Sequence, residues 1–373
     1  MDGSPARRRL LAGVDVGGST IDVLVADSDL RVVARRQVPT DPGGDPVAQI
    51  GRVVEESLAE AGRSSRDLAA VGVGVPGQVD VADGVVALAV NLAWPPLPLG
   101  PLLAERLGVP CVVENDVRAA AAGLAWRWRR AHDGAVPDLA FLSVGTGIAA
   151  GVVLEGRLRR GRHGLAGEIG HLVVDPAGPV CGCGLTGCLE AVAAGPAIAR
   201  QARDAVATGR LTRLPRDGTA SARHVFEAAA VGDPVALEIA ERVGRHLARA
   251  VHLLAMTYDV ERIAIGGGVA AAGRPFFAPI LAELERLRDA SPLVRRALAP
   301  GGVELVPPEA DAGPWGALAL VLDGSPADVS DPGSPAIDGP AAGREIGDVE
   351  DGAPSAAAAT TTGPNDVRRW RTG

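Results

Sequence analysis

The chain has 373 residues, of which 47% are hydrophobic and 22% charged, enough for two folded domains with buried cores. Its formal net charge is -8, and all 37 of its Lys and Arg positions are arginine. The absence of lysine excludes a P-loop lysine, a lysine Schiff base and a kinase-type Lys–Glu pair, and the acidic balance argues against a nucleic-acid-binding protein, which would carry a basic patch.

The N-terminal half begins with apolar and polar residues in alternation, the pattern of half-buried strands. Three consecutive strands are predicted there, at 10–16, 20–27 and 30–39. The next elements are a helix, two strands and a second helix that begins right after Asp116, predicted at 45–62, 69–77, 111–117 and 117–132.

The same order returns in the second half. Three strands are again predicted first, at 139–144, 147–156 and 157–161. A helical region from about residue 193 follows, then a strand that enters a triple-glycine turn and two helices, at 263–270, 275–288 and 313–322. A three-strand unit with glycine in its first turn therefore opens each half. We predict duplicated α/β domains facing a cleft, with two unrelated hairpins as the alternative.

This organisation predicts the domain boundaries. The first α/β domain is expected at 10–117, completed by a helix at 313–323, and the second at 118–312. Residues 1–9 are expected to be a flexible N-terminus rather than a signal peptide, because Asp15 and neighbouring glycines interrupt the apolar run behind them.

Other segments indicate the compartment. The uncharged stretch 85–104 contains four prolines and is no membrane helix. Three of the four cysteines lie within eight residues, which indicates metal binding in a reducing compartment. Residues 324–373 lack apolar periodicity and predict a disordered, solvated tail, with a binding role as the alternative. We expect a cytoplasmic protein with no membrane partner.

Glycine turns at strand ends predict phosphate binding. The first turn follows a strand and continues into another, so it is a hairpin in which backbone N–H groups and hydroxyls face an anion; it comprises Asp15, Gly17, Gly18, Ser19 and Thr20. Asp15 would hold Mg²⁺ (magnesium) through water. The second turn is Gly145, Thr146 and Gly147, and the third, at which a flat adenosine could lie against backbone, is Gly266, Gly267 and Gly268.

Two motifs carry further chemistry. Glu114-Asn115-Asp116 ends a strand and begins a helix, so it is either a simple N-cap or a general base held ionised at a helix N-terminus. His171 and three cysteines, Cys181, Cys183 and Cys188, supply the four ligands of a closed, structural Zn²⁺ (zinc) site.

The sequence resembles the ROK family of bacterial sugar kinases and repressors, within the actin-like, hexokinase-type ATPase superfamily. The motifs that carry the resemblance are DVGGST, Pro-Gly at 76–77, NLAW, END, GTG, EIGH and CGCGLTGCLE, over roughly 10–322. The resemblance implies two actin-like, ribonuclease H-like domains that close on ATP, Mg²⁺ and a hexose, and a small zinc-binding insertion at 168–190.

The resemblance also implies roles for residues. Asp116 would deprotonate the sugar 6-hydroxyl, which attacks the γ-phosphate. The residues expected to hold sugar hydroxyls are Asn115, Glu168, His171 and Glu190, with Asn91 and Gly77 as wall residues. Because one ring nitrogen of His171 would bind zinc, the other would donate its proton to a sugar hydroxyl.

Alternatives concern the substrate and the branch of the family. Glucose is the default hexose, and N-acetylhexosamines, amino sugars and cyclitols are the alternatives; a silent sugar-binding protein or regulator is a more distant one. Only about ten residues precede the first strand, so a DNA-binding repressor is not expected. Ser19 and Thr20 replace the family's usual Thr-Lys pair, and Ala149 and Ala150 stand where glycines are commoner. Family members are commonly homodimers or homotetramers, and we expect the same here.

Overall fold

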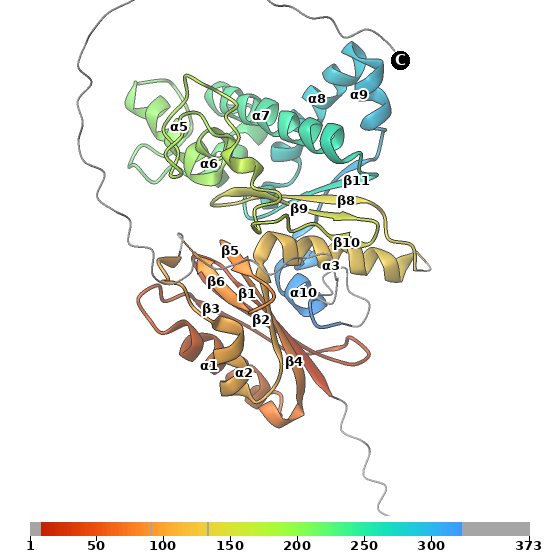
Figure 1. The fold of residues 1–373 in the computed structure, drawn as a ribbon. Helices are drawn as coiled ribbons and strands as arrows, with labels where there is room; N and C mark the ends of the chain where they lie inside the picture. The colour runs from red at the N-terminus through yellow and green to blue at the C-terminus, as the bar shows by residue number, and fades with distance from the viewer. Residues whose placement is uncertain (1–8, 90–91, 133, 323–373) are drawn as a thin grey trace, which may run out of the picture. The chain divides into compact units, whose positions relative to one another are not determined.

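The computed structural model describes residues 9–89, 92–132 and 134–322 (Figure 1). Its first half contains a five-stranded sheet in the order β3-β2-β1-β4-β7. These strands are β1 (Leu10–Val16), β2 (Thr20–Asp27), β3 (Val32–Pro39), β4 (Leu68–Val75) and β7 (Cys111–Asn115). The strands β1, β2 and β3 are antiparallel, whereas β4 and β7 continue the sheet in parallel.

The second half contains a five-stranded sheet in the order β10-β9-β8-β11-β12. Its strands are β8 (Leu139–Val144), β9 (Ile148–Leu154), β10 (Arg157–Leu158), β11 (Arg262–Gly266) and β12 (Val303–Leu305). Three are again antiparallel neighbours, and β11 and β12 again extend the sheet in parallel. The two sheets have one topology, which confirms the predicted duplication.

Alternation along the strands determines which helices each sheet face contacts. In β2, Val23 and Val25 face the core beneath α1 (Pro46–Glu60) and α2 (Leu99–Leu107), whereas Leu24 packs on the opposite face with Leu318 of α10 (Ala312–Ala319). Helix α1 begins at Pro46, because the Asp45 carboxylate caps the N–H groups of its first turn.

The second sheet follows the same rule. Residues such as Leu142 pack with the large helical cluster, and Phe141 packs on the other face with α3 (Asp116–Ala131). The helices of that cluster are α4 (Leu189–Ala193), α5 (Gly195–Ala207), α6 (Ala222–Ala230), α7 (Pro234–Tyr258), α8 (Arg274–Ala290) and α9 (Pro292–Ala297). Helices α3 and α10 pack against each other, α3 on strands of both sheets and α10 on β1, β2 and β4 (Figure 1).

The structure differs from the predicted elements in several places. Helix α3 begins at Asp116 itself, because the side chain of Asn115 caps it. The third strand of the second half ends at Leu158. The N–H of Arg159 still donates to the carbonyl of Val152 on β9 at 2.8 Å, and the side chain of Arg160 then turns to a buried carboxylate. The elements that were not predicted are α2, α9, β12 and the small hairpin of β5 (Gln78–Asp80) and β6 (Val85–Leu88).

Three expectations lie partly or wholly outside the described residues. The tail 324–373 and Asn91 are among these, as is most of 1–9. The boundary expected between 117 and 118 stays a prediction. Among the described helices, none combines the length and the apolar composition needed to cross a bilayer.

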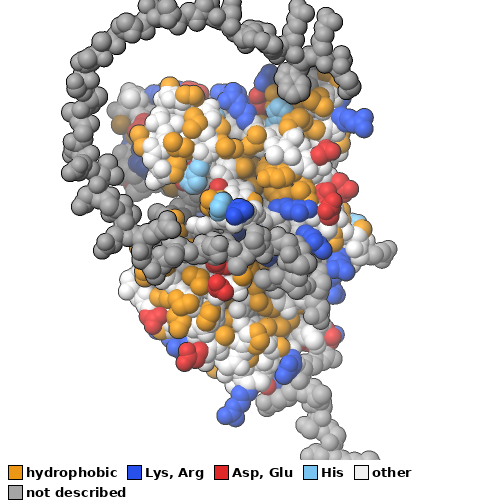
Figure 2. Space-filling model, in the orientation of Figure 1, with side chains coloured by type: hydrophobic (Ala, Val, Ile, Leu, Met, Phe, Trp, Pro, Cys, Tyr) orange, Lys and Arg blue, Asp and Glu red, His pale blue; other side chains and the backbone are white. Residues whose placement is uncertain are grey.

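Charged side chains of both signs are interspersed on the face drawn in Figure 2. Many arginines pair with carboxylates of the same chain, such as Arg36 with Glu56 at 3.0 Å and Arg242 with Glu238 at 2.7 Å. Exposed pairs of this kind contribute little to stability, about 0–1 kcal/mol each. Part of the arginine content therefore forms ion pairs on the surface of the same chain.

The crossing of α3 and α10 gives a testable prediction. A Cβ atom on Gly123 would lie 2.6 Å from the Cα atom of Gly316, where only backbone could yield. We expect Gly123→Ala to lower the free energy of unfolding by about 1–3 kcal/mol despite the better helix propensity of alanine. Urea unfolding measures this. Gly51→Ala is the control, because its new methyl group meets only the movable Arg106 side chain. An unchanged or raised stability of Gly123→Ala would contradict the close crossing.

Candidate active site

A cleft of about 250 Å³ lies between strand ends of both sheets and the first turns of α3 and α10. Four of the predicted site residues line it, namely Asp15, Asp116, Gly266 and Gly267. The rest of the lining is largely apolar or backbone, as at Val306, Pro307 and Gly313. The cleft therefore presents two carboxylates on one side and uncharged groups on the other.

Asp15 is the penultimate residue of β1, and its carboxylate lies against the first turn of α10. A Cβ atom on Gly313 would overlap that carboxylate. Burial, followed by the charges of Asp116 and Asp22, raises the pKa of Asp15 from 3.8 to about 7. A carboxylate in this setting is stabilised by a bound cation.

Asp116 is held by the hydrogen bonds that begin α3. Its Oδ1 atom accepts from the N–H of Val117 at 2.9 Å and from Nδ2 of Asn115 at 3.0 Å. The amide of Asn115 also donates to the carbonyl of Gly77 at 3.1 Å, and its oxygen caps the helix. The N-cap interpretation of this motif is thus correct for Asn115, and Asp116 is left facing the cleft.

The pKa of Asp116 is raised from 3.8 to about 6. Burial is the largest cause, and the charge of Glu168 adds to it. The N–H of Val117 and the guanidinium of Arg118 act in the opposite direction. A carboxyl group with this pKa is ionised at neutral pH and is a better proton acceptor than an ordinary aspartate.

Gly77 completes the wall next to Asp116. Its φ is +108°, and a Cβ atom there would overlap the carbonyl oxygen of Leu88. Only glycine fits this turn between β4 and β5. Gly77, Asn115 and Asp116 are therefore neighbours, and Glu168 is near enough for its charge to raise the pKa of Asp116.

The second and third glycine turns lie together. A Cβ atom on Gly145 would be 3.8 Å from the nitrogen of Gly268, and the N–H of Val269 donates to the carbonyl of Val144 at 2.9 Å. Gly267 has a φ of +95°, and a Cβ atom on it would lie 2.6 Å from the carbonyl oxygen of Val144. This packing requires glycine there.

The remaining predicted phosphate residues do not line the cleft. The hairpin residues Gly18, Ser19 and Thr20 are exposed at the β1–β2 turn. Thr40 donates to the carbonyl of Gly17 at 2.8 Å and so fixes this turn. Thr146 is likewise exposed.

Glu190 begins α4 and lies on the second turn. Its Oε2 atom accepts from the N–H of Ile148 at 3.0 Å, and a Cβ atom on Gly147 would lie 2.6 Å from the same oxygen. One oxygen of this predicted sugar ligand is therefore engaged by backbone. The contact joins the segment of the cysteines to the turn between β8 and β9.

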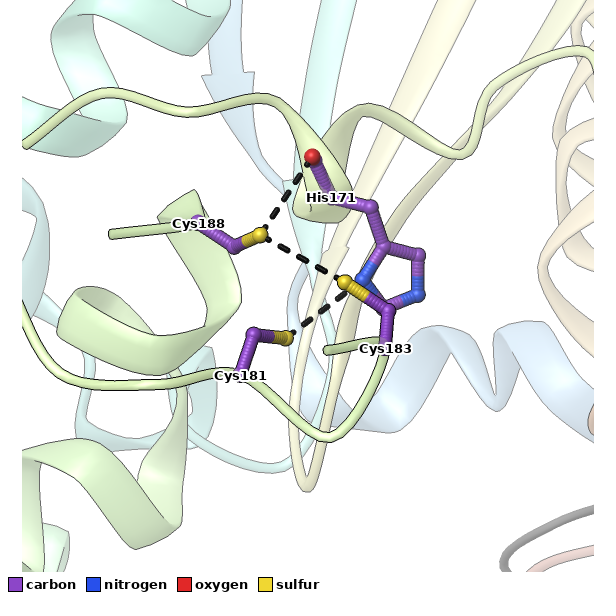
Figure 3. A group of neighbouring side chains, drawn as sticks. All are labelled: His171, Cys181, Cys183 and Cys188. Carbon is purple, nitrogen blue, oxygen red and sulfur yellow. Dashed lines mark hydrogen bonds between the residues drawn. The ribbon is translucent and has the colours of Figure 1, made fainter. Parts of the chain in front are cut away.

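The His and Cys side chains form a cluster whose four ligand atoms all lie within 4.8 Å of one another. Sγ of Cys181 is 3.6 Å from Nδ1 of His171, and Sγ of Cys183 is 3.6 Å from Sγ of Cys188. Figure 3 shows the Nδ1 side of the imidazole turned toward the sulfur atoms and the Nε2 side turned away. The cluster can hold a metal ion.

Sequence reasoning missed one buried group of charges beside the site. Glu114 is fully buried, and its carboxylate accepts from Nε of Arg118 at 2.8 Å and from Nε of Arg160 at 2.7 Å. The arginines lower the pKa of Glu114 against the effect of burial. No helical i,i+4 pattern signals the first pair, because Glu114 lies on β7 and Arg118 on α3.

Comparisons with known proteins agree with these features. The sequence signature described as "ROK family" matches residues 11–323. A glucokinase of Halalkalibacterium halodurans is 36% identical over 285 residues, covering 74% of this chain and 86% of that protein. An N-acetylmannosamine kinase of Citrobacter koseri is 33% identical over 267 residues, covering 69% and 83%.

A solved structure is similar over most of the chain. It is a ROK family glucokinase from Streptomyces griseus in complex with glucose and AMPPNP, 33% identical, with a TM-score of 0.66. The match covers 83% of this chain and 98% of that one. By its sequence, its paired sheets and its Cys/His cluster, this chain belongs to the ROK family.

Proposed function

We propose that the chain is an ATP-dependent sugar kinase that transfers the γ-phosphate to the 6-hydroxyl of glucose or a related hexose. The observation that carries this proposal is Asp116, a partly buried carboxylate with a pKa of about 6 at the edge of a cleft that also holds Asp15 and a glycine turn. The relatives named glucokinase and the similar structure with glucose and AMPPNP support the same activity.

Asp116 is the general base. Its Oδ1 atom already accepts two N–H groups, which orients the carboxylate, and Oδ2 is the oxygen that takes the proton. As the sugar oxygen forms its bond to the γ-phosphorus, the bond from that phosphorus to the bridging oxygen of ADP breaks. The hydroxyl proton goes to Asp116.

The sugar lies beside the base. Asn115, Glu168, His171 and Glu190 hold its hydroxyls, and Gly77 forms part of the wall. Asn91 keeps its predicted place in that wall as part of the proposal. Ionised carboxylates suit this role because each accepts a charge-assisted hydrogen bond from a hydroxyl donor.

ATP occupies the cleft on the side of the second sheet. The glycine turn at 266–268 and the apolar wall of Val306 and Pro307 fit a flat base and its ribose. The turns at 17–20 and 145–147 approach the phosphates. Asp15 fits Mg²⁺, since it offers a carboxylate oxygen in the same cleft, and this ion supplies charge neutralisation to the phosphates when bound.

The Cys/His cluster fits Zn²⁺. Bonds of about 2.0–2.3 Å around a tetrahedral ion place ligand atoms about 3.5–3.8 Å apart. Two of the six separations between ligand atoms are 3.6 Å, and all lie within 4.8 Å. Zinc on Nδ1 leaves Nε2 of His171 as a proton donor turned away from the cluster. The clustered free thiols also support a cytoplasmic location. The homodimer or homotetramer stays a prediction.

Turnover against a panel of sugars tests the function. ADP release is measured with ATP and Mg²⁺ and glucose, N-acetylglucosamine, N-acetylmannosamine, mannose, fructose, kanosamine or a cyclitol. We expect strong turnover with glucose. N-acetylmannosamine is the second candidate, because relatives with that activity in their names are similar over the same range. Silence across the panel with folded, zinc-loaded protein contradicts the kinase proposal.

Asp116→Asn tests the base. We expect kcat to fall by about 10²–10⁴-fold with sugar affinity largely retained. For the unchanged enzyme, kcat/KM should fall as pH drops through about 6, because the raised pKa leaves Asp116 protonated below that value. Asp217→Asn, in an exposed turn, is the control. A near-normal kcat in Asp116→Asn would remove this residue as the base.

Cys183→Ser tests the link between zinc and sugar. We expect the bound zinc, measured by metal analysis, to fall well below one ion per chain, and the sugar KM to rise, since His171 loses its fixed orientation. Cys111→Ser is the matched control, because Cys111 lies on β7 outside the cluster. Tight sugar binding without zinc would break the proposed link.

A further inference from the structure

Three buried charges join two segments of the site that are far apart in sequence. Glu114 is the penultimate residue of β7, and its side chain is 0% exposed. Arg118, 2% exposed, is in the first turn of α3, and Arg160, 15% exposed, follows β10. We refer to Glu114, Arg118 and Arg160 as the buried triad.

The triad holds the segment that leads into Glu168. Nη1 of Arg118 donates to the carbonyl of Gly164 at 2.7 Å, and Nε of Arg160 donates to Glu114 at 2.7 Å. Within the segment, the N–H of Ala166 donates to the carbonyl of Arg160 at 3.1 Å. Residues 159–167 are therefore attached to the start of α3 at two points.

The same side chains hold the residues next to the base. Oε1 of Glu114 accepts from the backbone N–H of Asn115 at 2.8 Å as well as from Arg118. Asp116 lies between these residues in the chain. A single carboxylate thus contacts both the cap of α3 and the arginine that reaches across to Gly164.

Stability alone does not account for this arrangement. Burying an ion pair or triad has a large desolvation cost, and apolar replacements of similar size are often neutral or stabilising. Nη2 of Arg118 is buried and has no hydrogen-bond partner within the described residues, which adds a further unfavourable group. A second role for the arginine explains why an unsatisfied donor is retained here.

The charge of the triad is opposite in sign to that of the neighbouring carboxylates. Two guanidinium groups and one carboxylate leave one net positive charge. The charged side chains that act on Asp116 are Arg118 of α3 and Glu168 before the following turn, and Asp116 in turn acts on Asp15 of β1. Arg118 is the cation among them, and it opposes the effect of burial on the pKa of Asp116.

We propose that Arg118 is a positioning residue, which fixes segment 159–167 to the start of α3 and so holds Glu168 and Asp116 in one geometry around the sugar. This inference rests on the proposed kinase function. Arg118 does not touch the reacting atoms; it acts through Gly164 and Glu114. Its guanidinium also keeps the base ionised, a role that an uncharged anchor would not supply.

The test separates the fork of Arg118 from its charge. Arg118→Lys keeps the charge and loses the planar fork. We expect its sugar KM to rise about 10- to 100-fold. The acid limb of its pH profile, the fall of kcat/KM at low pH, should stay near its original pH. Arg118→Met loses both, so its sugar KM rises equally and its acid limb moves up by about one pH unit.

Arg160→Gln acts from the other end of the triad. It removes one of the two attachments and leaves Arg118 on Gly164 and beside Asp116, so we expect a smaller rise in sugar KM than in the Arg118 variants and no change in the pH at which kcat/KM falls. Arg130→Met, an exposed arginine on the same helix α3, is the control for loss of an arginine. Thermal unfolding of each variant confirms that it is folded. If Arg118→Met does not fold, Arg118→Lys and Arg160→Gln still decide whether the anchor sets the sugar KM.

The outcomes are distinguishable. The inference is overturned, and the kinase proposal is left intact, if the wild-type enzyme is active and the three variants lose only stability. The sugar KM and the pH at which kcat/KM falls would then be unchanged in Arg118→Met, Arg118→Lys and Arg160→Gln. Wild-type enzyme that is inactive with every sugar overturns the kinase proposal itself, and the inference with it. Raised KM in all three, with a moved limb in Arg118→Met alone, supports the inference.

Discussion

The close crossing of α3 and α10 is the constraint on which the candidate site depends. Backbone meets backbone at Gly123 and Gly316, so the two helices approach more closely than side chains would allow. The first residue of α3 is Asp116, and the first turn of α10 lies on the carboxylate of Asp15. Strands β1 and β7 both pair with β4, which brings the two carboxylates to one edge of the sheet, and the crossing places the first turn of α10 over them in one cleft. A wider crossing would move that turn away from Asp15 and open the cleft.

Three carboxylates near this crossing show how partners, rather than depth alone, determine a pKa. Glu114 is the most deeply buried, yet its pKa is lowered because two arginines contact it. The side chains of Asp15 and Asp116 are more exposed than that of Glu114, yet their pKa values are raised. Burial raises them, and no guanidinium among the described residues pairs with either carboxylate at hydrogen-bond distance to offset it. The site therefore holds one carboxylate whose ionised form two arginines stabilise and two whose charge responds to ligands. The first is suited to structure, and the others to a cation and a proton.

Much of this arrangement follows from local sequence, and the rest depends on tertiary contacts. Period-two alternation located the opening strands of both sheets, and the spacing of His171 and the cysteines located a cluster that can hold a metal ion. β12 has only three residues, too few for alternation to be recognised, and α2 tolerates Pro101 because it stands in the first turn. The pairing of Glu114 with Arg160 joins residues 46 positions apart, and no local pattern contains it. Sequence motifs therefore identified four residues that line the cleft, Asp15, Asp116, Gly266 and Gly267, but not the buried side chains that hold the start of α3.

The identical topology of the two sheets has a consequence for how the site divides its work. Asp15 and Ser143 are both penultimate in equivalent first strands, and both line the cleft. Gly77 and Gly267 follow equivalent strands with similar positive φ values. After the edge strands, however, one copy has Asp116 and the other has Val306. At these equivalent positions the N-terminal copy presents carboxylates and the C-terminal copy presents uncharged groups, so one repeated topology gives the cleft two walls of different chemistry.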